Sequence, residues 1–155
     1  MRRLDREILD FNQIIDIVDK SNVVRLVIND ELYPYIVPLS FGYEVIDNKV
    51  VLYIHSAQSG KKIDLIKKNN NVSVEFDYFV KTETMHYGIT ARYKSVIANG
   101  LAKFLDNDLD KKKGLQLICN HYGYNNYDLS NCKTFDKCMV IKIELLNITG
   151  KKNID

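Results

Sequence analysis

The sequence has little of what builds membrane, metal or redox sites. No apolar run in its 155 residues approaches the about 20 residues that span a bilayer. Residues 1–7 reach acidic side chains before any apolar segment, so we expect an unexported, cytoplasmic protein. The three cysteines, Cys119, Cys132 and Cys138, include no Cys-x-x-Cys pair. We therefore expect reduced, mostly buried thiols and no metal site.

A strong charge of one sign is also missing. The 22 basic and 20 acidic side chains leave a formal net charge of +2, which argues against a protein that coats nucleic acid or an acidic membrane. No Gly-x-Gly-x-x-Gly fingerprint is present, so a nicotinamide nucleotide would bind only transiently. The length suits one hydrophobic core, and we expect a single domain over residues 1–155.

What is present is a series of β-branched and aromatic runs separated by short polar turns, which indicates an antiparallel meander. No alternation of strands with helices appears, and this favours a barrel over a doubly wound sheet. We expect a mainly β fold with flanking helices. The six expected strands cover residues 23–28, 35–44, 50–55, 72–79, 92–105 and 138–149.

A helix is expected near the start of the chain, over residues 11–18. Asp10 stands at its N-cap position, immediately before an apolar pattern of helical period. Leu9 and Ile14 have the spacing of a hydrophobic staple, which would set the angle at which the chain enters the helix. We expect this helix to pack across one end of the sheet.

Two further helices are expected between strands. A short one covers residues 59–69, and a longer one covers residues 108–122. The lysine run at 111–113 is typical of the solvated face of such a helix. Residues 123–135, rich in Tyr, Asn and Asp, have no period and predict an ordered loop.

Residues 53–62 are the segment most typical of a functional site. They run from a strand through small residues into a helix start, where the helix dipole favours an anion and disfavours Lys61 and Lys62. A bound phosphate would satisfy both the dipole and the lysines. The alternative is that Ser56 or Ser59 caps the helix and both lysines point into water.

Four blocks stand in a fixed order along the chain. They are YPYIVPLSFGY at 33–43, LYIHSA at 52–57 with GKK at 60–62, YKSVI at 93–97 with Gly100, and ITGK at 148–151. Together they resemble the signature of nitroimidazole-resistance proteins in the pyridoxamine 5′-phosphate oxidase-like superfamily. The resemblance implies a six-stranded antiparallel split β-barrel that dimerises and holds two FMN molecules in clefts between its subunits.

Carried over position by position, the resemblance implies an FMN site in several parts. The segment along the isoalloxazine would be Ile36, Val37, Pro38, Leu39 and Ser40. Pro38 lacks a backbone donor, which suits a strand edge that faces either a cofactor or solvent. The residues near the flavin ring, its ribityl chain and its phosphate would be His55, Ser56, Ala57, Lys61 and Lys62. Of the two lysines we expect Lys62 to contribute more.

The resemblance also implies roles for three residues whose alternatives are structural. His55 would be catalytic, since imidazole titrates near neutral pH and can donate a proton or orient a substrate, or it is a structural residue at a strand end. Tyr93 and Ser95 would reach the FMN of the other subunit, or they are ordinary members of an alternating strand. We expect His86 and His121 to be surface or structural residues.

The implied function is an FMN-dependent oxidoreductase that passes electrons from a nicotinamide nucleotide to a small acceptor, such as a 5-nitroimidazole. The alternatives are a noncatalytic flavin carrier or sensor, and a relative that binds haem or a deazaflavin on the same barrel. The chain ends soon after Gly150 and lacks the Trp and Arg region of true pyridoxamine-phosphate oxidases, so we do not expect that activity. Residues 81–91, where substrate contacts are expected, match no block, and the substrate stays open.

Overall fold

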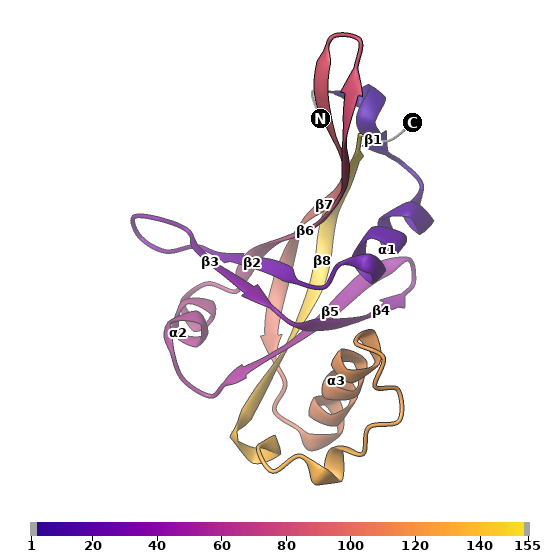
Figure 1. Cartoon of the computed structure of the whole chain (residues 1–155). Coiled ribbons are helices and arrows are strands. Elements are labelled where there is room, and N and C mark those ends of the chain that lie inside the picture. The colour runs from indigo at the N-terminus through magenta and orange to yellow at the C-terminus, as the bar shows by residue number, and fades with distance from the viewer. Residues whose placement is uncertain (1–2, 154–155) are drawn as a thin grey trace.

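The computed structural model describes residues 3–153 as an antiparallel sheet with helices around it (Figure 1). Hydrogen-bonded neighbours follow the order β3-β2-β6-β7-β8-β5-β4, and β1 pairs with β8. Every described pairing is antiparallel, as expected. The strands are β1 (Glu7–Ile8), β2 (Val24–Ile28), β3 (Tyr35–Leu39), β4 (Phe41–Ile46), β5 (Lys49–Ala57), β6 (Asn71–Met85), β7 (Gly88–Phe104) and β8 (Cys138–Lys152).

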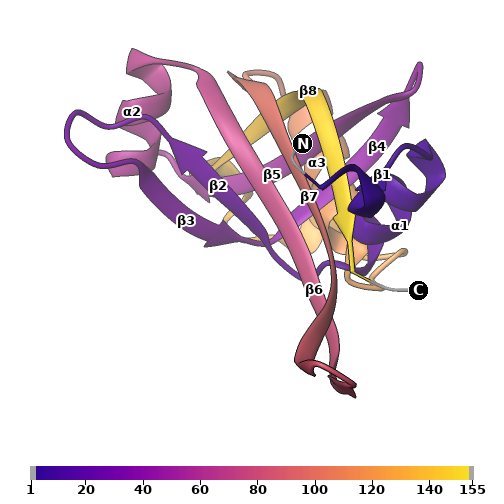
Figure 2. The same cartoon turned by 90° about the horizontal axis from the view of Figure 1, so that it is seen from above.

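The sheet curls into a barrel because one stretch of chain supplies both of its edges (Figure 2). β3 pairs with β2, β4 pairs with β5, and Ser40 alone separates β3 from β4. The expected fold class, a mainly β split barrel with flanking helices, is therefore confirmed. The expected six strands become eight because the run over residues 35–44 divides at Ser40 and because β1 adds a two-residue strand.

Alternate side chains of the strands fill the barrel. Val24, Leu26 and Ile28 of β2 are buried, whereas Arg25 between them is exposed, as the two-residue period of a strand requires. Phe41 and Phe76 meet edge to face inside, with ring centroids 5.2 Å apart. The same interior buries alternate residues of β5, namely Val50, Leu52 and Ile54. The end of β5, from His55 to Ala57, therefore follows directly on a packed segment of the core.

The first helix, α1 (Phe11–Lys20), begins at the expected cap. The Asp10 carboxylate accepts a hydrogen bond from the Asn12 N–H at 2.9 Å. The helix contacts β6 and β7 through its buried apolar face. The expected staple is wrong, since Leu9 is 87% exposed. Ile8 of β1 is the buried side chain at this point, and strand alternation turns Leu9 outward.

The long helix, α3 (Asp108–His121), packs on the outside of β4 and β5. Asn107 caps it by accepting a hydrogen bond from the Asp110 N–H at 2.9 Å. The approach to β4 is very close, because a Cβ added to Gly42 would lie 2.3 Å from the backbone carbonyl carbon of Leu117. Only glycine at position 42 allows the helix to dock at this distance.

The lysine run on α3 is less free than expected. Lys112 and Lys113 are exposed, but the Lys113 ammonium donates to the Glu44 carboxylate at 2.7 Å. Lys111 is half-buried, with its ammonium 4.6 Å from the centre of the Phe135 ring. The expected ordered loop after α3 is present, and it contains a short 3₁₀ turn at Leu129–Asn131 before a second at Phe135–Lys137.

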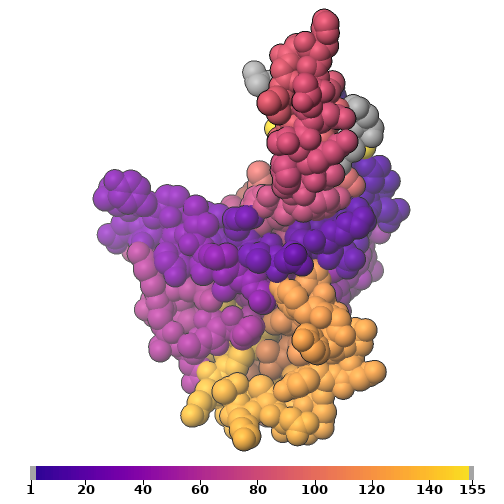
Figure 3. Space-filling view, viewed as in Figure 1, coloured from indigo at the N-terminus to yellow at the C-terminus, as the bar shows by residue number. Residues whose placement is uncertain are grey.

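The β6–β7 hairpin extends well beyond the barrel as an arm (Figures 1 and 3). Both strands are longer than expected, and residues 81–91 form the far part of this arm. Arg92 is buried at its base and donates to the Glu83 carboxylate at 2.7 Å. The turn ends at Gly88, whose φ of +134° favours glycine.

The cysteines and the remaining histidines have structural surroundings. All three cysteines are free thiols, as expected, but each is half-buried rather than buried. His121 packs on Phe41 at 4.2 Å between ring centroids, and its Nε2 lies 2.9 Å from the Ser21 carbonyl oxygen. His86 is exposed at the hairpin turn. Within residues 3–153, no helix is long and apolar enough to cross a bilayer.

Candidate functional site

The junction of β5 with α2 (Lys61–Lys68) is the centre of the candidate site. Gly60 occupies the N-cap position with φ of +126°, a conformation that L side chains rarely adopt. No side chain caps α2, so a serine cap from Ser56 or Ser59 is wrong. The first helical bonds run from the N–H groups of Ile63 and Asp64 to the Gly60 carbonyl, and the N–H groups before them face the helix entrance.

The two lysines of the first turn differ in their surroundings. Lys61 pairs with Asp30 at 2.7 Å and lies 5.3 Å from the centre of the Tyr35 ring. The hydrogen bond to Asp30 raises the pKa of Lys61. Lys62 is half-buried, burial lowers its pKa, and no carboxylate of residues 3–153 pairs with it. Lys62 is therefore the cation that a phosphate at this junction would stabilise most.

His55 lies on the outward side of β5, close to Lys62. Its direct neighbour on β8 is Val140, and those of Ser56 and Ala57 are Met139 and Cys138. The imidazole is open to solvent on one side, yet burial on the other and the charge of Lys62 lower its pKa. His55 is therefore a neutral imidazole near pH 7, with one N–H donor and one acceptor nitrogen.

The β3 segment presents alternate residues to the two sides of the sheet. Ile36, Pro38 and Ser40 are exposed, whereas Val37 and Leu39 pack against the barrel core. β3 is an edge strand in the sheet order, so the expectation of an edge for Pro38 is confirmed. β4 continues the chain with Phe41 opposite Ile54, which brings Ser40 next to the end of β5 that holds His55.

A row of direct cross-strand neighbours crosses the outer face of the sheet. Pro38 lies opposite Arg25, Arg25 opposite Glu75, Glu75 opposite Ile97, and Ile97 opposite Thr149. Arg25 donates to Glu75 at 2.8 Å within this row. Tyr93 and Ser95 precede Ile97 on β7 at two-residue intervals and share its face. We call this surface the outer face.

Comparison with known proteins now identifies the family. The model described as pyridoxamine 5′-phosphate oxidase matches residues 10–152. The chain belongs to the pyridoxamine 5′-phosphate oxidase family. It is 31% identical to a solved structure from Bacteroides thetaiotaomicron, described as a candidate 5-nitroimidazole antibiotic resistance protein, with 94% of this chain and 86% of that chain covered and a TM-score of 0.84.

More distant members of this family's fold are also similar. An FAD-binding protein from Mesorhizobium loti is 22% identical, with 94% of this chain and 96% of that chain covered and a TM-score of 0.69. The FAD and haem binding protein from Mycobacterium smegmatis is 15% identical, with 97% and 74% covered and a TM-score of 0.79. These two likenesses show the fold. A search of curated protein sequences gives no match.

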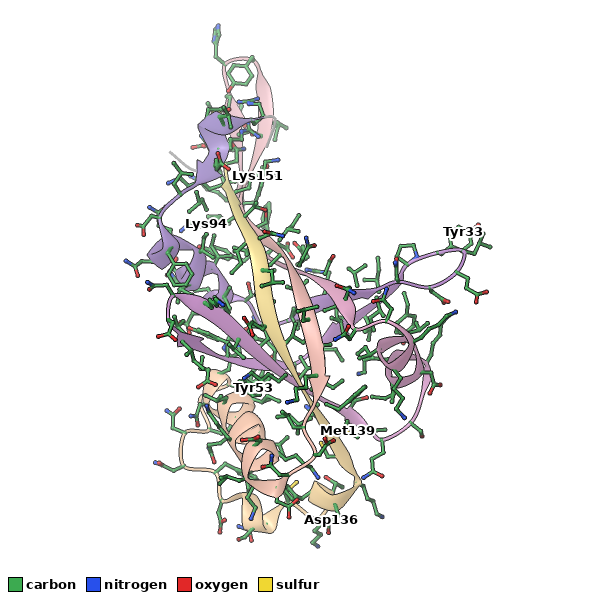
Figure 4. The ribbon with its side chains drawn as sticks, turned by 180° about the vertical axis from the view of Figure 1, so that it is seen from behind. Tyr33, Tyr53, Lys94, Asp136, Met139 and Lys151 are labelled. Atoms are coloured by element: carbon green, nitrogen blue, oxygen red, sulfur yellow. The ribbon has the colours of Figure 1, made fainter. Side chains whose placement is uncertain are left out.

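In this pyridoxamine 5′-phosphate oxidase family chain, the expected site residues form two separate groups. His55, Ser56, Ala57 and Lys62 gather at the β5–α2 junction, with the β3 edge near them. Tyr93 and Ser95 lie elsewhere, because Ser95 neighbours Lys151 on β8, whereas His55 neighbours Val140. The eleven residue-to-residue steps from Val140 to Lys151 make roughly 35 Å of strand. Figure 4 shows Met139 and Lys151 at opposite ends of β8.

Two basic residues beside Tyr93 escaped sequence reasoning. The Lys151 ammonium lies 5.7 Å from the centre of the Tyr93 ring. Partial burial alone would raise the pKa of Tyr93, but hydrogen bonds from Lys151 and Arg6 outweigh burial and lower it. Lys151 ends one of the four matched blocks, and this was the available signal. Arg6 carries none, because β1 reaches Lys151 only through the Glu7–Lys151 pairing.

Several cavities within residues 3–153 are large enough for a small molecule, and two of them bear on the site. One, of about 430 Å³, is lined by His55, Ser56 and Ala57 together with α3 and residues 127–138. The other, of about 540 Å³, is lined by Glu44, Tyr53 and Lys113 among others and contains no expected site residue. The Tyr53 hydroxyl donates to Glu44 there at 2.6 Å and the Lys113 ammonium at 2.7 Å, so these three lining side chains already pair with one another. Of these two cavities, only the one of about 430 Å³ is lined by residues that the sequence predicted for the site.

Proposed function

We propose that this protein is an FMN-dependent oxidoreductase. It works as a homodimer and reduces small acceptors, 5-nitroimidazoles among them, with electrons from a nicotinamide nucleotide. The observation that carries the proposal is Lys62, a half-buried cation without a carboxylate partner in the described residues, at a helix N-terminus that no side chain caps. The cytoplasmic location and the single-domain organisation stay predictions.

The first step is phosphate binding at the β5–α2 junction. The N–H groups at the entrance of α2 and the positive end of its dipole attract an anion. A phosphate there would also restore to Lys62 the stabilisation that burial removes from its ammonium form. A charge-assisted hydrogen bond of this kind contributes about 1.5–3 kcal/mol. Lys61, already paired with Asp30, contributes less.

The second step is placement of the ring. β3 is an edge strand whose exposed side, with Ile36, Pro38 and Ser40, leads toward the end of β5. An isoalloxazine along Ile36–Ser40 would therefore connect with a phosphate at Lys62 through a ribityl chain near His55 and Ser56. The flavin supplies the electron transfer, and the protein supplies anchoring and orientation. The neutral His55 donates its N–H to an oxygen of the acceptor.

The third step is dimerisation. Tyr93 and Ser95 lie on β7 opposite the end of β8 that is remote from His55, too far for one FMN to touch both groups in a single chain, so their expected contact with FMN requires a second subunit. Large apolar side chains are exposed on the outer face, with Ile36 at 57% and Ile97 at 53%. Exposed apolar surface of this kind is typical of a protein–protein interface. The same face carries Pro38 beside Arg25. Contact through this face would bury the apolar residues and bring Tyr93 of each subunit toward its partner.

The test is the visible spectrum, mass and turnover of purified protein. We expect an FMN spectrum with a dimer mass by light scattering, and oxidation of reduced nicotinamide nucleotide when 2-methyl-5-nitroimidazole is added. A yellow dimer without turnover would support a flavin carrier or sensor instead. A haem or deazaflavin spectrum would redirect the cofactor assignment. A colourless monomer that stays colourless after FMN is added would overturn the proposal.

A further inference from the structure

The cavity beside His55 gathers side chains from three parts of the chain. The end of β5 supplies His55, α3 supplies Leu115 and Cys119, and residues 127–138 supply Cys132 and Cys138. All three cysteines of the protein thus line one space of about 430 Å³. Within residues 3–153 no cluster of three His, Cys, Asp or Glu side chains could hold a metal ion, and this holds for the three thiols as well.

The lining of this cavity is apolar and nearly uncharged. Leu115, Ile118 and Leu129 contribute hydrocarbon. Burial raises the pKa of the Cys119 and Cys138 thiols, which stay protonated at neutral pH. Lys137 is the one charged residue among those described that line the cavity, and it is exposed. Transfer of a charged ligand from water into such a space is unfavourable.

A hydrogen bond connects the outer wall of the cavity, formed by residues 127–138, with the β5–α2 junction. The Gln58 side-chain amide donates to the Asp136 carbonyl at 2.6 Å, which links residues 127–138 to the turn before α2. Asp136 lies at the far end of the molecule beside the start of β8 (Figure 4). The Asp128 carboxylate braces the same wall by accepting from the Ser130 N–H at 2.9 Å. These hydrogen bonds position the segment of residues 127–138 beside the cavity.

We infer that this cavity is the acceptor site and that it takes a small, uncharged, single-ring molecule, which reaches His55 from the side of α3. The inference rests on the proposed function for the source of the electrons. Occupancy of the cavity does not depend on turnover, so it can be tested in oxidised protein. His55, the expected catalytic residue, lines the cavity and also belongs to the β5–α2 junction, so it connects the two.

The three thiols provide a direct readout of occupancy. In oxidised, FMN-loaded protein, saturating nitrobenzene should slow alkylation of Cys132 by N-ethylmaleimide about fivefold or more, as mass spectrometry of the labelled peptides would measure. The permanently charged 4-nitrobenzyltrimethylammonium ion should give no protection, because the cavity would have to desolvate it. Equal labelling rates with and without nitrobenzene would overturn the assignment, and so would equal protection by the cation.

Cys132→Phe tests the same assignment by filling the cavity from its loop wall. We expect the KM for 2-methyl-5-nitroimidazole to rise about tenfold, which corresponds to about 1.4 kcal/mol, while the Kd for FMN stays within about twofold. The matched control is Asn126→Phe, an exposed position of the same loop that does not line the cavity, and it should change neither value. A loss of FMN affinity with unchanged KM would overturn the proposal, because the cavity would then hold the flavin.

Failure of the proposed function would look different from failure of this inference. A protein that binds no FMN or shows no turnover still reports nitrobenzene binding through the labelling rate of Cys132. Protection without turnover would retain the cavity as a binding site and reject the reductase. Turnover without protection would retain the reductase and reject this cavity as its acceptor site. If Cys132→Phe fails to fold, the labelling of the unmodified protein decides alone.

Discussion

Lys62 and His55 form a close pair of basic groups where β5 passes into α2. Burial lowers the pKa of both groups, and the charge of Lys62 lowers the pKa of His55 further. A bound phosphate would oppose these effects, because a nearby negative charge stabilises the protonated form of each group. Both side chains should therefore respond to FMN binding, although only Lys62 is expected to contact the phosphate.

Lys62→Ala should weaken FMN binding by about tenfold or more, since a charge-assisted hydrogen bond is worth about 1.5–3 kcal/mol. The matched control is Lys67→Ala near the end of the same helix, where a cation already suits the dipole. Each variant removes one positive charge from α2. Fluorescence titration with FMN measures both, and equal affinities would rule out a phosphate site at Lys62.

His55 should make stability depend on pH in a defined direction. The folded chain binds the His55 proton less readily than the unfolded chain, because the pKa of His55 is lowered from its ordinary 6.5. Its contribution to stability is therefore present above about pH 6.5 and is lost as the pH falls below that value. Urea unfolding at about pH 7.5 and pH 5.5 should show a smaller loss for His55→Gln than for the unmodified protein.

His86→Gln, at the exposed hairpin turn, is the matched control for this pH effect. NMR titration adds a second measurement, since Lys62→Ala should raise the pKa of the His55 ring by removing the neighbouring charge. An unchanged ring pKa in Lys62→Ala would show that the two side chains do not interact. Equal pH sensitivity of His55→Gln and unmodified protein would contradict the stability prediction.

Gly42→Ala should destabilise the docking of α3. The added Cβ would meet the Leu117 carbonyl carbon at 2.3 Å and the Ile118 nitrogen at 2.4 Å, and backbone atoms of a helix cannot rotate away. We expect the free energy of unfolding to fall by about 3 kcal/mol, the upper range for overpacking. Gly123→Ala, with φ of +85° and no atom within 4 Å, should cost only the strain of about 1–2 kcal/mol. Equal losses would show that α3 shifts freely.

Ile97→Lys should weaken the proposed dimer. Ile97 is 53% exposed at the centre of the outer face, and a lysine there would place a charge in an interface that otherwise buries apolar surface. Light scattering should show monomer, with FMN affinity reduced at the same time. Ile46→Lys, 41% exposed on β4 and away from the outer face, should stay dimeric. A dimeric Ile97→Lys variant would place the interface elsewhere.

Much of the fold could be predicted from local sequence patterns. The N-cap at Asp10 depends on neighbours within a few residues, so its sequence signal was sufficient, whereas the expected serine cap of α2 was wrong because Gly60 takes that position. The two-residue period of the strands likewise separated inward from outward side chains. The Leu9 staple was wrong because a long-range pairing, β1 with β8, determined which side chain is buried.

The sequence by itself determined the antiparallel β pattern in outline, the start of α1 and the family blocks, including the lysines at the entrance of α2. Only the tertiary structure separated Lys61, paired with Asp30, from Lys62, which has no such partner in the described chain. It also gathered Cys119, Cys132 and Cys138 around one cavity beside His55. The physical reason is that burial and ion pairing depend on residues that the barrel brings together from distant parts of the chain, and no local period records those partners.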